Sequence, residues 1–446
     1  MVDEEVLQLK AVVTAGKVTG QRLSVPGDKS ISHRALLLGL LSEGQYRVFG
    51  LSRADDVMAT YRLVEALGVE IASGSSSSIS LTPASEKVIE PKDVLDVGNS
   101  GTLIRLASGI LAHMDGATFF LNGDASIRRR PMARVTQPLR LMGAEIYGRD
   151  SGNLAPLAIV GKRLKAIEYR LPVASAQVKS AVIFGGLGAD GTTVVEEIEP
   201  TRSHTEEMLL AFGADLSIER SADAVRISVA PSQLRGSDIH VPGDPSSAAF
   251  FIALGLMTNC QVGVDGIYLG PQRDGFIDIL KEMGAKIEIV ADGKGSFDVT
   301  TGPSRLHSVA TDGHDAASYI DEVPIIATVA AICDGISEFR GLEELRHKES
   351  DRIKTTLAML RSFGVECGEH EDGLFVVGNS HIQQSRLRVV DAHFDHRIAM
   401  SASILTMALG GSTEISGFDS VATSFPTFVD LLRSVGGSVE FDPSEL

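Results

Sequence analysis

The sequence predicts an α/β protein of two domains, each built from three copies of one unit of strands and helices. Three observations carry this prediction. Short glycine signatures recur at intervals of 70 to 80 residues, and nearly uniformly apolar segments lie between them. A Val-Pro-Gly-Asp turn at residue 25 recurs at residue 241, about half a chain later. A regular period is the mark of a repeat architecture.

Six glycines divide the chain at this period. Each follows an amphipathic segment, such as residues 276–283, and most precede a run that alternates apolar and polar residues. Glycine just past a helix end, followed by such alternation, predicts a surface helix that ends and leads into a strand. The six are Gly68, Gly143, Gly213, Gly284, Gly364 and Gly436.

The second series consists of six segments that are apolar on every face, and helices of that kind are predicted to be buried. Short β-prone runs follow several of them, at residues 117–121, 192–195 and 261–264. One unit is therefore predicted to contain a strand, a buried helix, a strand, a surface helix, a glycine and a strand. The predicted buried helices occupy residues 35–41, 103–111, 178–187, 248–257, 323–332 and 398–409.

The repeated Val-Pro-Gly-Asp turn predicts two domains of three units: residues 21–240, and residues 241–446 together with residues 1–20. The last unit ends at residues 439–441 without the second strand that the other units have. Residues 11–13 are therefore expected to supply that strand. Residues 73–78, which are mostly serine, are expected to form a hairpin tip.

Composition argues against several classes of protein. Hydrophobic residues make up 43% of the chain and charged residues 22%, the balance of an ordinary globular protein. No apolar run reaches the roughly 20 residues of a membrane span, and the acidic first residues do not resemble a signal peptide, so a cytoplasmic protein is expected. The net charge of −17 argues against nucleic acid as a partner. The three cysteines show no metal-ligand or disulfide spacing and are expected to be small buried residues.

The stretch from residue 25 to residue 34 carries the first candidate site. It joins a Pro-Gly turn to a serine-rich helix start and adds two cations, Lys29 and Arg34. Backbone N–H groups and the helix dipole attract anions at a helix start. The glycines that would wrap a nucleoside triphosphate are missing, so the stretch predicts an anion pocket of another kind.

Polar residues gather at the amino-terminal ends of the other predicted buried helices as well. If the helices of a domain run parallel, these ends converge on one surface. Two such surfaces would form a cleft between the domains that suits a multiply anionic ligand. The residues are Lys29 and Ser30, residues 99–102, Ser175 and Gln177, Asp321 and Glu322, and residues 395–397.

Four arginine-containing clusters add to this pattern, at residues 128–130, 201–204, 346–352 and 395–397. Most arginines are solvated or paired at a surface, but the planar guanidinium also suits phosphate and carboxylate ligands. Asp321 and Glu349 are candidates for a base and an acid in these regions. Equally, Asp321 could cap a helix and Glu349 could pair with a nearby cation, and the residues alone leave both interpretations open.

At these residues the chain resembles the 5-enolpyruvylshikimate-3-phosphate synthase family of enolpyruvyl transferases. That family has an inverse α/β barrel-like fold of two domains, each of three βαβαββ units with buried parallel helices, which agrees with the six repeats. The matching motifs span nearly the whole chain: Pro-Gly-Asp-Lys-Ser-Ile-Ser-His-Arg-Ala at residues 26–35, Gly-Asn-Ser-Gly-Thr at 98–102, Arg-Pro at 130–131, Ala-Ser-Ala-Gln-Val-Lys at 174–179, Ile-Asp-Glu at 320–322, Lys-Glu-Ser-Asp-Arg at 348–352, Asp-His-Arg-Ile at 395–398 and Ser-Phe-Pro at 424–426.

The resemblance implies transfer of the enolpyruvyl group of phosphoenolpyruvate to the 5-hydroxyl of shikimate 3-phosphate. The products would be phosphate and 5-enolpyruvylshikimate 3-phosphate, on the shikimate pathway to chorismate and the aromatic amino acids. It further implies a monomer that needs no metal and no other cofactor. The small-molecule substrates would be its partners, with no nucleic acid and no membrane.

The resemblance also assigns the site. Asp321 would accept the hydroxyl proton, Glu349 would protonate the methylene carbon, and Lys29 would act beside them. Shikimate 3-phosphate would be held by Lys29, Ser30, Arg34, Ser175, Gln177, Arg202, Asp321 and Lys348. Phosphoenolpyruvate would be held by Lys29, Gly101, Arg130, Gln177, Arg352 and Arg397.

Two features depart from the family's commonest pattern. Thr423 stands where some members carry a lysine, so one phosphoenolpyruvate contact is absent or differently supplied. Residues 174–177 and 201–204 resemble a less common branch, many of whose members resist the inhibitor glyphosate. Gly101, however, leaves the space that an alanine would fill, so this chain is expected to be sensitive to glyphosate.

Two other functions stay open on sequence alone. An enolpyruvyl transferase of the same fold that acts on UDP-N-acetylglucosamine would be expected to carry a reactive cysteine in a mobile loop and a Lys-Asn pair near the amino terminus. A phosphometabolite-binding protein without catalytic activity would hold similar anions. Phosphate release that requires both substrates together would distinguish an enzyme from such a binding protein.

Overall fold

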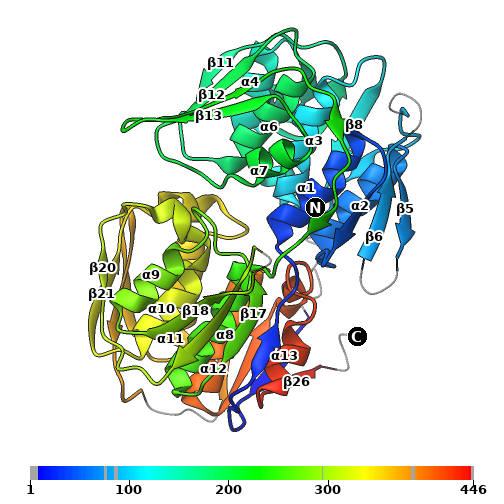
Figure 1. The fold of residues 1–446 in the computed structure, drawn as a ribbon. Helices are drawn as coiled ribbons and strands as arrows, with labels where there is room; N and C mark the ends of the chain where they lie inside the picture. The colour runs from blue at the N-terminus through cyan, green and yellow to red at the C-terminus, as the bar shows by residue number, and fades with distance from the viewer. Residues whose placement is uncertain (1–8, 75–77, 85–88, 294, 383–386, 443–446) are drawn as a thin grey trace, which may run out of the picture. The chain divides into compact units, whose positions relative to one another are not determined.

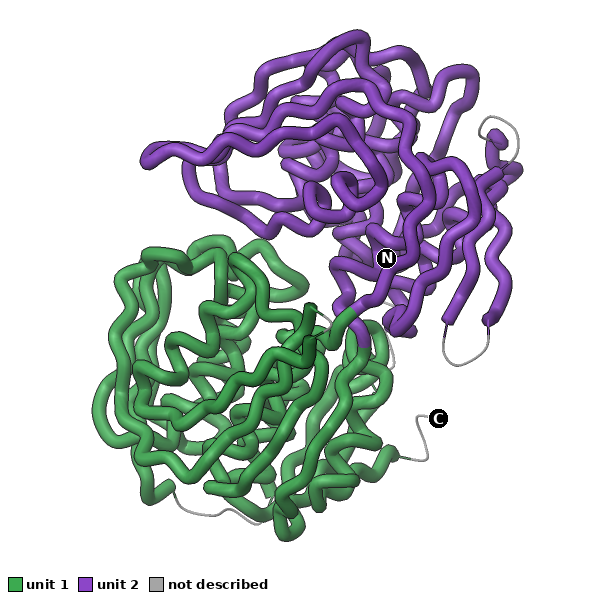
Figure 2. The backbone as a smooth tube through the Cα atoms, viewed as in Figure 1, with its two compact units in different colours: residues 1–26, 242–446 green, residues 27–241 purple. Residues whose placement is uncertain are grey.

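The computed structural model describes residues 9–74, 78–84, 89–293, 295–382 and 387–442 (Figure 1). The chain forms two compact units, one of residues 27–241 and one of residues 1–26 and 242–446 (Figure 2). The described residues contain six four-stranded sheets, three in each unit. In every one of these sheets one edge strand is parallel to its neighbour, and the other neighbouring strands are antiparallel.

The unit of residues 27–241 has three helices in its interior and three on its outside. The inner helices are α1 (Lys29–Leu37), which continues into the short helix η1 (Leu38–Leu40), α3 (Gly101–Ala112) and α6 (Ala176–Leu187). The outer helices are α2 (Asp55–Ala66), α4 (Ala133–Leu141) and α7 (His204–Ala211). The short turns η2 (Ile127–Arg129) and α5 (Arg149–Gly152) flank α4.

This unit contains three four-stranded sheets, whose strands follow one another along the chain except for one strand of the first sheet, at residues 239–240. The first has the order β16 (Ile239–His240), β4 (Tyr46–Phe49), β6 (Ser78–Thr82) and β5 (Glu70–Ser73). The second has the order β7 (Leu95–Asp96), β8 (Thr118–Asn122), β10 (Leu154–Val160) and β9 (Glu145–Gly148). The third has the order β11 (Glu168–Arg170), β12 (Thr193–Glu197), β14 (Val225–Val229) and β13 (Leu216–Arg220). A short pair joins β15 (Leu234–Arg235) to β3 (Ser42–Glu43).

The other unit repeats this plan. Its inner helices are α8 (Pro245–Thr258), α10 (Val323–Ala331) and α12 (His396–Leu409), and its outer helices are α9 (Gly275–Glu282), α11 (Arg352–Ser362) and α13 (Phe428–Ser434). Its short 3-10 helices are η3 (Ala316–Ser318), η4 (Ile320–Glu322), η5 (Glu343–His347) and η6 (Phe418–Val421).

The three sheets of this unit have the same strand pattern. One has the order β18 (Lys286–Ala291), β19 (Phe297–Gly302), β17 (Gly263–Ile267) and β2 (Arg22–Ser24). Another has the order β20 (Ala310–Thr311), β21 (Gly335–Phe339), β23 (Gly373–Gly378) and β22 (Glu366–His370). The last has the order β24 (Leu387–Asp391), β25 (Ser412–Ser416), β1 (Ala11–Thr14) and β26 (Ser438–Phe441). The prediction of six repeats of strands and helices, three in each compact unit, is confirmed.

The first strands of the two halves are exchanged, which corrects the expected domain boundary. β2 directly precedes α1 in the chain but pairs in parallel with β17, whereas β16 directly precedes α8 but pairs with β4. Because the hydrogen bonds of residues 22–24 are made to β17, residues 21–26 belong with residues 242–446. The boundary therefore lies between Pro26 and Gly27 rather than after residue 20.

The strand that residues 11–13 were expected to supply is β1. It lies between β25 and β26 and is antiparallel to both, so the amino-terminal segment completes the last sheet. β5 and β6 are antiparallel neighbours, and residues 75–77 of the expected hairpin tip lie outside the described residues.

The six repeat glycines end the outer helices. Each follows the C-cap residue of an outer helix and has a positive φ, between 78° and 106°. A side chain is strained in this backbone conformation, and glycine adopts it at little cost. The conformation ends the helix and turns the chain into the next strand, as the sequence predicts.

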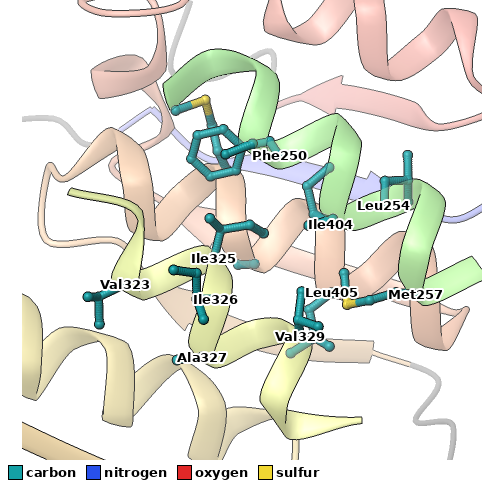
Figure 3. Close-up of a cluster of buried hydrophobic side chains, with 14 of the residues drawn as sticks. Phe250, Leu254, Met257, Val323, Ile325, Ile326, Ala327, Val329, Ile404 and Leu405 are labelled. Carbon is teal, nitrogen blue, oxygen red and sulfur yellow. The ribbon is translucent and has the colours of Figure 1, made fainter. Parts of the chain in front are cut away.

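The inner helices are buried because neighbouring helices and surrounding sheets cover them. In the unit of residues 1–26 and 242–446, Phe250 of α8, Ile325 of α10 and Ile404 of α12 belong to one hydrophobic core and are at most 2% exposed (Figure 3). Cys333 is buried as expected, whereas Cys260 and Cys367 are only partly buried. Among the described residues, no helix combines the length and the apolar character needed to cross a membrane.

His113, at the end of α3, is expected to make the stability of the unit of residues 27–241 dependent on pH. Burial lowers the pKa of His113 to about 4, and its Nδ1 lies 3.3 Å from the carbonyl oxygen of Gly109. An unfolded histidine titrates near pH 6.5, so below that pH the unfolded chain binds a proton that the folded chain excludes. The stability of the folded chain is therefore unaffected by the titration of His113 above pH 6.5, and it decreases as the pH falls from 6.5 toward 4. Between pH 7.5 and pH 5 we expect a loss of about 2 kcal/mol in the free energy of unfolding.

Chemical unfolding followed by circular dichroism at these two pH values tests this expectation. His113→Gln should lose less stability than the wild type over the same interval. His314→Gln is the matched control, because the His314 side chain is 84% exposed. Equal pH dependence of the wild type and His113→Gln would contradict the assignment.

Candidate active site

Lys29 is the first residue of α1. It gives its name to the Lys29 cluster, which consists of the expected site residues of this unit together with Asp56: Lys29, Ser30, Arg34, Asp56, Gly101, Arg130, Ser175, Gln177 and Arg202. Asp28 caps the helix, because its Oδ1 accepts a hydrogen bond of 2.8 Å from the backbone N–H of Ile31. The Lys29 Nζ lies 3.0 Å from Asp56 Oδ2, and the lysine side chain is 26% exposed. A cation at a helix start is thus held in place while part of it stays accessible to an anion.

Asp56 connects Lys29 to a buried histidine. The Nε2 of His33 lies 3.6 Å from Asp56 Oδ2 and 3.5 Å from the hydroxyl of Ser100, which caps α3. The other ring nitrogen lies 2.6 Å from the hydroxyl of Thr60. Burial would raise the pKa of Asp56, but the charges and hydrogen bonds of Lys29 and His33 outweigh it and hold that pKa below its usual range. The starts of α1, α2 and α3 are therefore linked through Asp56 and His33.

Gly101, Arg130 and Gln177 come together at the first turn of α3. A Cβ atom placed on Gly101 would lie 2.6 Å from Nη1 of Arg130. Gln177, on α6, donates a hydrogen bond of 2.9 Å to the hydroxyl of Thr102 and accepts one from Arg105. The three expected phosphoenolpyruvate residues from distant parts of the sequence are thus gathered at one helix start.

Arg34, which is expected to hold shikimate 3-phosphate, is a buried residue with several protein partners. It is 3% exposed, and its guanidinium donates to the hydroxyls of Thr205 and Ser180, at 2.6 and 2.7 Å, and to the carbonyl oxygen of Ser30, at 3.0 Å. Burial lowers the pKa of Arg34 to about 10, although nearby carboxylates oppose this shift. The hydrogen bonds of Arg34 in the structure therefore go to protein groups.

Ser175 and Arg202 occupy the starts of two further helices. The Ser175 hydroxyl caps α6 and accepts a hydrogen bond of 3.4 Å from Val178 N–H. Arg202 is half-buried in the segment before α7, and its charge contributes to the lowered pKa of Arg34. Within this unit the predicted gathering of helix starts is therefore found.

In the other unit, Arg352 is the centre of a second group that we call the Arg352 cluster: Asp321, Glu322, Lys348, Glu349, Arg352, Asp395 and Arg397. Arg352 is 1% exposed. Its guanidinium reaches Asp395 Oδ2 at 2.8 Å, Glu349 Oε2 at 2.5 Å and Asp321 Oδ1 at 3.3 Å. Burial disfavours the charge, but these three carboxylates hold the pKa of Arg352 above its usual range. The expected base and acid are thus joined by one arginine.

Asp321 lies in η4 rather than at a cap. The N-cap residue of α10 is Glu322, and it makes no side-chain cap hydrogen bond. The capping alternative for Asp321 is therefore wrong, whereas the ion-pair alternative for Glu349 is confirmed by its contact with Arg352. Lys348 Nζ also reaches Asp321 Oδ1, at 3.0 Å. Asp321 thus carries two cationic partners.

Arg397 joins the starts of the three inner helices of this unit. Its guanidinium donates to the carbonyl oxygen of Asp321 at 2.6 Å and to Glu322 Oε1 at 3.3 Å. The same Glu322 oxygen accepts a hydrogen bond from Ser246 on α8. Asp395 caps α12 and accepts from Arg397 N–H at 3.0 Å.

The structure gives a contact to three carboxylates for which the sequence predicted no catalytic or binding role: Asp56, Glu322 and Asp395. Each is a counter-charge of a predicted substrate-binding cation; Glu322 and Asp395 are buried, and the Asp56 side chain is 10% exposed. Glu322 and Asp395 lie inside quoted motifs, but their partners are distant in the sequence, so spacing could not reveal them. Thr423, in place of the family lysine, donates its hydroxyl to the carbonyl oxygen of Ser420 at 2.6 Å.

The chain matches known proteins along nearly its whole length. The model of the EPSP synthase (3-phosphoshikimate 1-carboxyvinyltransferase) family matches residues 13–432. A 3-phosphoshikimate 1-carboxyvinyltransferase of Synechococcus sp. (strain JA-3-3Ab) is 42% identical over 430 residues, which cover 95% of this chain and 96% of the relative. One from Caldicellulosiruptor saccharolyticus is 42% identical over 427 residues, covering 93% of this chain and 98% of the relative. A solved structure of EPSP synthase from Acinetobacter baumannii has a TM-score of 0.84 and 36% identity, and the match covers 98% of this chain and 100% of that one.

Proposed function

This chain belongs to the EPSP synthase family, and we propose that its Lys29 and Arg352 clusters contain the groups that carry out the family's reaction. The chain is a 3-phosphoshikimate 1-carboxyvinyltransferase: it transfers the enolpyruvyl group of phosphoenolpyruvate to shikimate 3-phosphate. Its relatives carry this name, which separates it from the UDP-N-acetylglucosamine enzyme and from a binding protein without catalytic activity.

The observation that carries the assignment of roles is the shared contact of Asp321 and Glu349 with Arg352. One carboxylate must accept the proton of the attacking hydroxyl while an acid protonates the methylene carbon. A guanidinium in contact with both carboxyl groups holds them in one place. In the proposal Asp321 is the base and Glu349 the acid.

The proposed reaction has two steps. In the first, the methylene carbon of phosphoenolpyruvate takes a proton from Glu349, the 5-hydroxyl oxygen bonds to the neighbouring carbon, and Asp321 takes the hydroxyl proton. In the second, the bond from that carbon to the phosphate oxygen breaks, Glu349 recovers a proton from the methyl group, and the double bond re-forms. Phosphate leaves with the electrons of the broken bond, and the proton on Asp321 passes to phosphate or solvent.

The cations of both clusters have the complementary role. The substrates together carry phosphate and carboxylate groups, whose repulsion Lys29, Arg130, Arg352 and Arg397 would offset. Lys29, Ser30, Arg34, Ser175, Gln177, Arg202 and Lys348 are proposed to bind shikimate 3-phosphate. We also propose a cytoplasmic monomer, and light scattering of the purified chain tests the oligomeric state.

A phosphate-release assay tests the proposed function directly. The purified chain should release phosphate when phosphoenolpyruvate and shikimate 3-phosphate are both present. Neither compound alone should give release above the rate without protein. Release from phosphoenolpyruvate alone would indicate a phosphatase and would contradict the proposal.

Gly101→Ala should weaken inhibition by glyphosate. The new Cβ would lie 2.6 Å from Nη1 of Arg130. The guanidinium must therefore move away from the position in which it is proposed to contact the bound anion. One methylene-sized change in a binding pocket alters affinity by roughly 10- to 200-fold. We expect the concentration of glyphosate needed for half inhibition to rise at least about tenfold, with a smaller rise in the KM for phosphoenolpyruvate.

Gly191→Ala is the matched control for this substitution. A Cβ on Gly191 would meet only the Cβ of Ala166, at 3.5 Å, which is an ordinary contact. Inhibition of that variant should equal inhibition of the wild type. An unchanged response of Gly101→Ala would refute the expectation.

A further inference from the structure

Four charged side chains are buried in the interior of the unit of residues 27–241, and we call them the buried ion cluster: Arg34, which also belongs to the Lys29 cluster, Lys179, Glu197 and Glu206. Each is at most 3% exposed. The Nζ of Lys179 lies 3.0 Å from Glu197 Oε2 and 2.7 Å from Glu206 Oε1. Glu206 is also the largest opposing influence on the lowered pKa of Arg34. Two cations and two carboxylates thus balance within the interior of the unit.

The buried ion cluster fixes both ends of one short segment, residues 201–206. At the beginning of this segment, Lys179 Nζ donates to the carbonyl oxygen of Thr201 at 3.3 Å, and the Thr201 hydroxyl donates to Glu197. At its end, the Thr205 hydroxyl accepts from Arg34 at 2.6 Å and shares a hydrogen bond of 2.6 Å with Ser180. Between these anchors lie Arg202 and Ser203, which are both half-exposed.

Stability alone gives no reason to bury these charges. Removing four charged groups from water is costly, and apolar side chains of similar volume are often as stable or more stable in such positions. Burial raises the pKa of Glu197 even beside Lys179, which reflects this cost. The charged side chains make directed hydrogen bonds to the backbone and hydroxyls of residues 201–205, which apolar side chains could not make.

Lys179 also links this segment to another part of the site. It lies on α6 one turn after Ser175, which caps the helix, and two residues after Gln177. Its contacts therefore fix the start of α6 and the start of α7 relative to each other. Ser175, Gln177 and Arg202 are all residues proposed to bind shikimate 3-phosphate.

We propose that Lys179 is a positioning residue for shikimate 3-phosphate, which holds Arg202 in place through its contacts with Thr201, Glu197 and Glu206. This inference rests on the function proposed above. Lys179 itself touches no substrate in this role, and its effect is on the geometry of Arg202. Gln177, which is expected to meet both substrates, is held by its own hydrogen bonds to Thr102 and Arg105. The binding of phosphoenolpyruvate is therefore expected to change much less than the binding of shikimate 3-phosphate.

The test compares Lys179→Gln with the wild type in steady-state kinetics for both substrates. We expect the KM for shikimate 3-phosphate to rise at least about tenfold, which is about 1.4 kcal/mol of binding free energy. The KM for phosphoenolpyruvate should stay within about threefold. Titration calorimetry with shikimate 3-phosphate alone should show the same loss of affinity, because the effect is on binding.

Val195→Ala is the matched control for a general loss of stability. Val195 is fully buried on β12, two residues before Glu197, and makes no polar contact through its side chain. If Lys179→Gln raises the KM for shikimate 3-phosphate no more than Val195→Ala does, Lys179 has only a structural role and the inference is overturned. An equal rise of both KM values would overturn it as well.

Glu197→Gln decides the question if Lys179→Gln does not fold. This variant keeps the shape of the side chain and leaves Lys179 paired with Glu206. A selective rise in the KM for shikimate 3-phosphate supports the inference, and unchanged kinetics overturns it. Failure of the wild type to release phosphate from the two substrates would instead contradict the proposed function, so the two failures are distinguishable.

Discussion

Asp321→Asn should lower kcat by about a thousandfold, within the range that general acid–base catalysis contributes. Asparagine keeps the size of the side chain and still accepts a hydrogen bond from Lys348 and Arg352. It cannot take the proton of the attacking hydroxyl, so the first step of the proposed reaction loses its base. Asp321→Ala should abolish turnover as well and leave substrate binding partly intact.

Phosphate release at saturating concentrations of both substrates measures this effect. Titration calorimetry with shikimate 3-phosphate should show that Asp321→Asn still binds the substrate. Asp315→Asn is the control, because the Asp315 side chain is 62% exposed and lies in the neighbouring turn. A fully active Asp321 variant would mean that another group is the base.

Arg352→Ala should produce the largest loss of stability among the site variants. Asp395 has no exposed surface and is paired with Arg352 through the guanidinium Nε and Nη2. Removing one partner of a buried ion pair typically costs 3–5 kcal/mol, because the other charge stays buried without its partner. In a unit of this size that corresponds to a fall in Tm on the order of 10 °C. Turnover should also be lost, since Arg352 holds both Asp321 and Glu349.

Thermal unfolding followed by circular dichroism measures the loss. The double variant Arg352→Ala with Asp395→Asn should recover part of it, because the unpaired buried charge is then absent. Arg361→Ala on the same helix is the control, since Arg361 is exposed and its change should stay within about 0.5 kcal/mol. A Tm for Arg352→Ala equal to that of the control would contradict the role given to the buried pair.

Local features of the sequence were sufficient to predict most of the fold. The repeat glycines could be assigned to helix ends because a positive φ is a local requirement that glycine satisfies. The inner helices could be recognised because a segment with no polar face cannot lie at a surface. β1 could be placed because one repeat lacked a strand and the amino terminus had a matching segment.

The exchange of β2 and β16 between the two units could not be predicted from the sequence and is seen only in the tertiary structure. Each has no more than three residues, so neither carries enough pattern to select a partner. The Val-Pro-Gly-Asp turn that follows each of them is nearly the same in the two halves. The pairing depends on which sheet edge is within reach after the helices have packed, and that is not a property of the segment.

By itself the sequence determined the six-fold repeat, the helix ends and the set of cations and carboxylates available for chemistry, because each depends on neighbouring residues or on composition. The tertiary structure decided which of those charges are buried and what they pair with. The sequence predicts the same kind of role for Arg34 and Arg352, as arginines that bind substrate. In the structure Arg34 donates hydrogen bonds to two hydroxyls and a carbonyl oxygen, whereas Arg352 donates to three carboxylates. Apart from Ser30 and Glu349, the partners of these two arginines lie 31 to 171 positions away in the sequence, so no local pattern encodes those contacts.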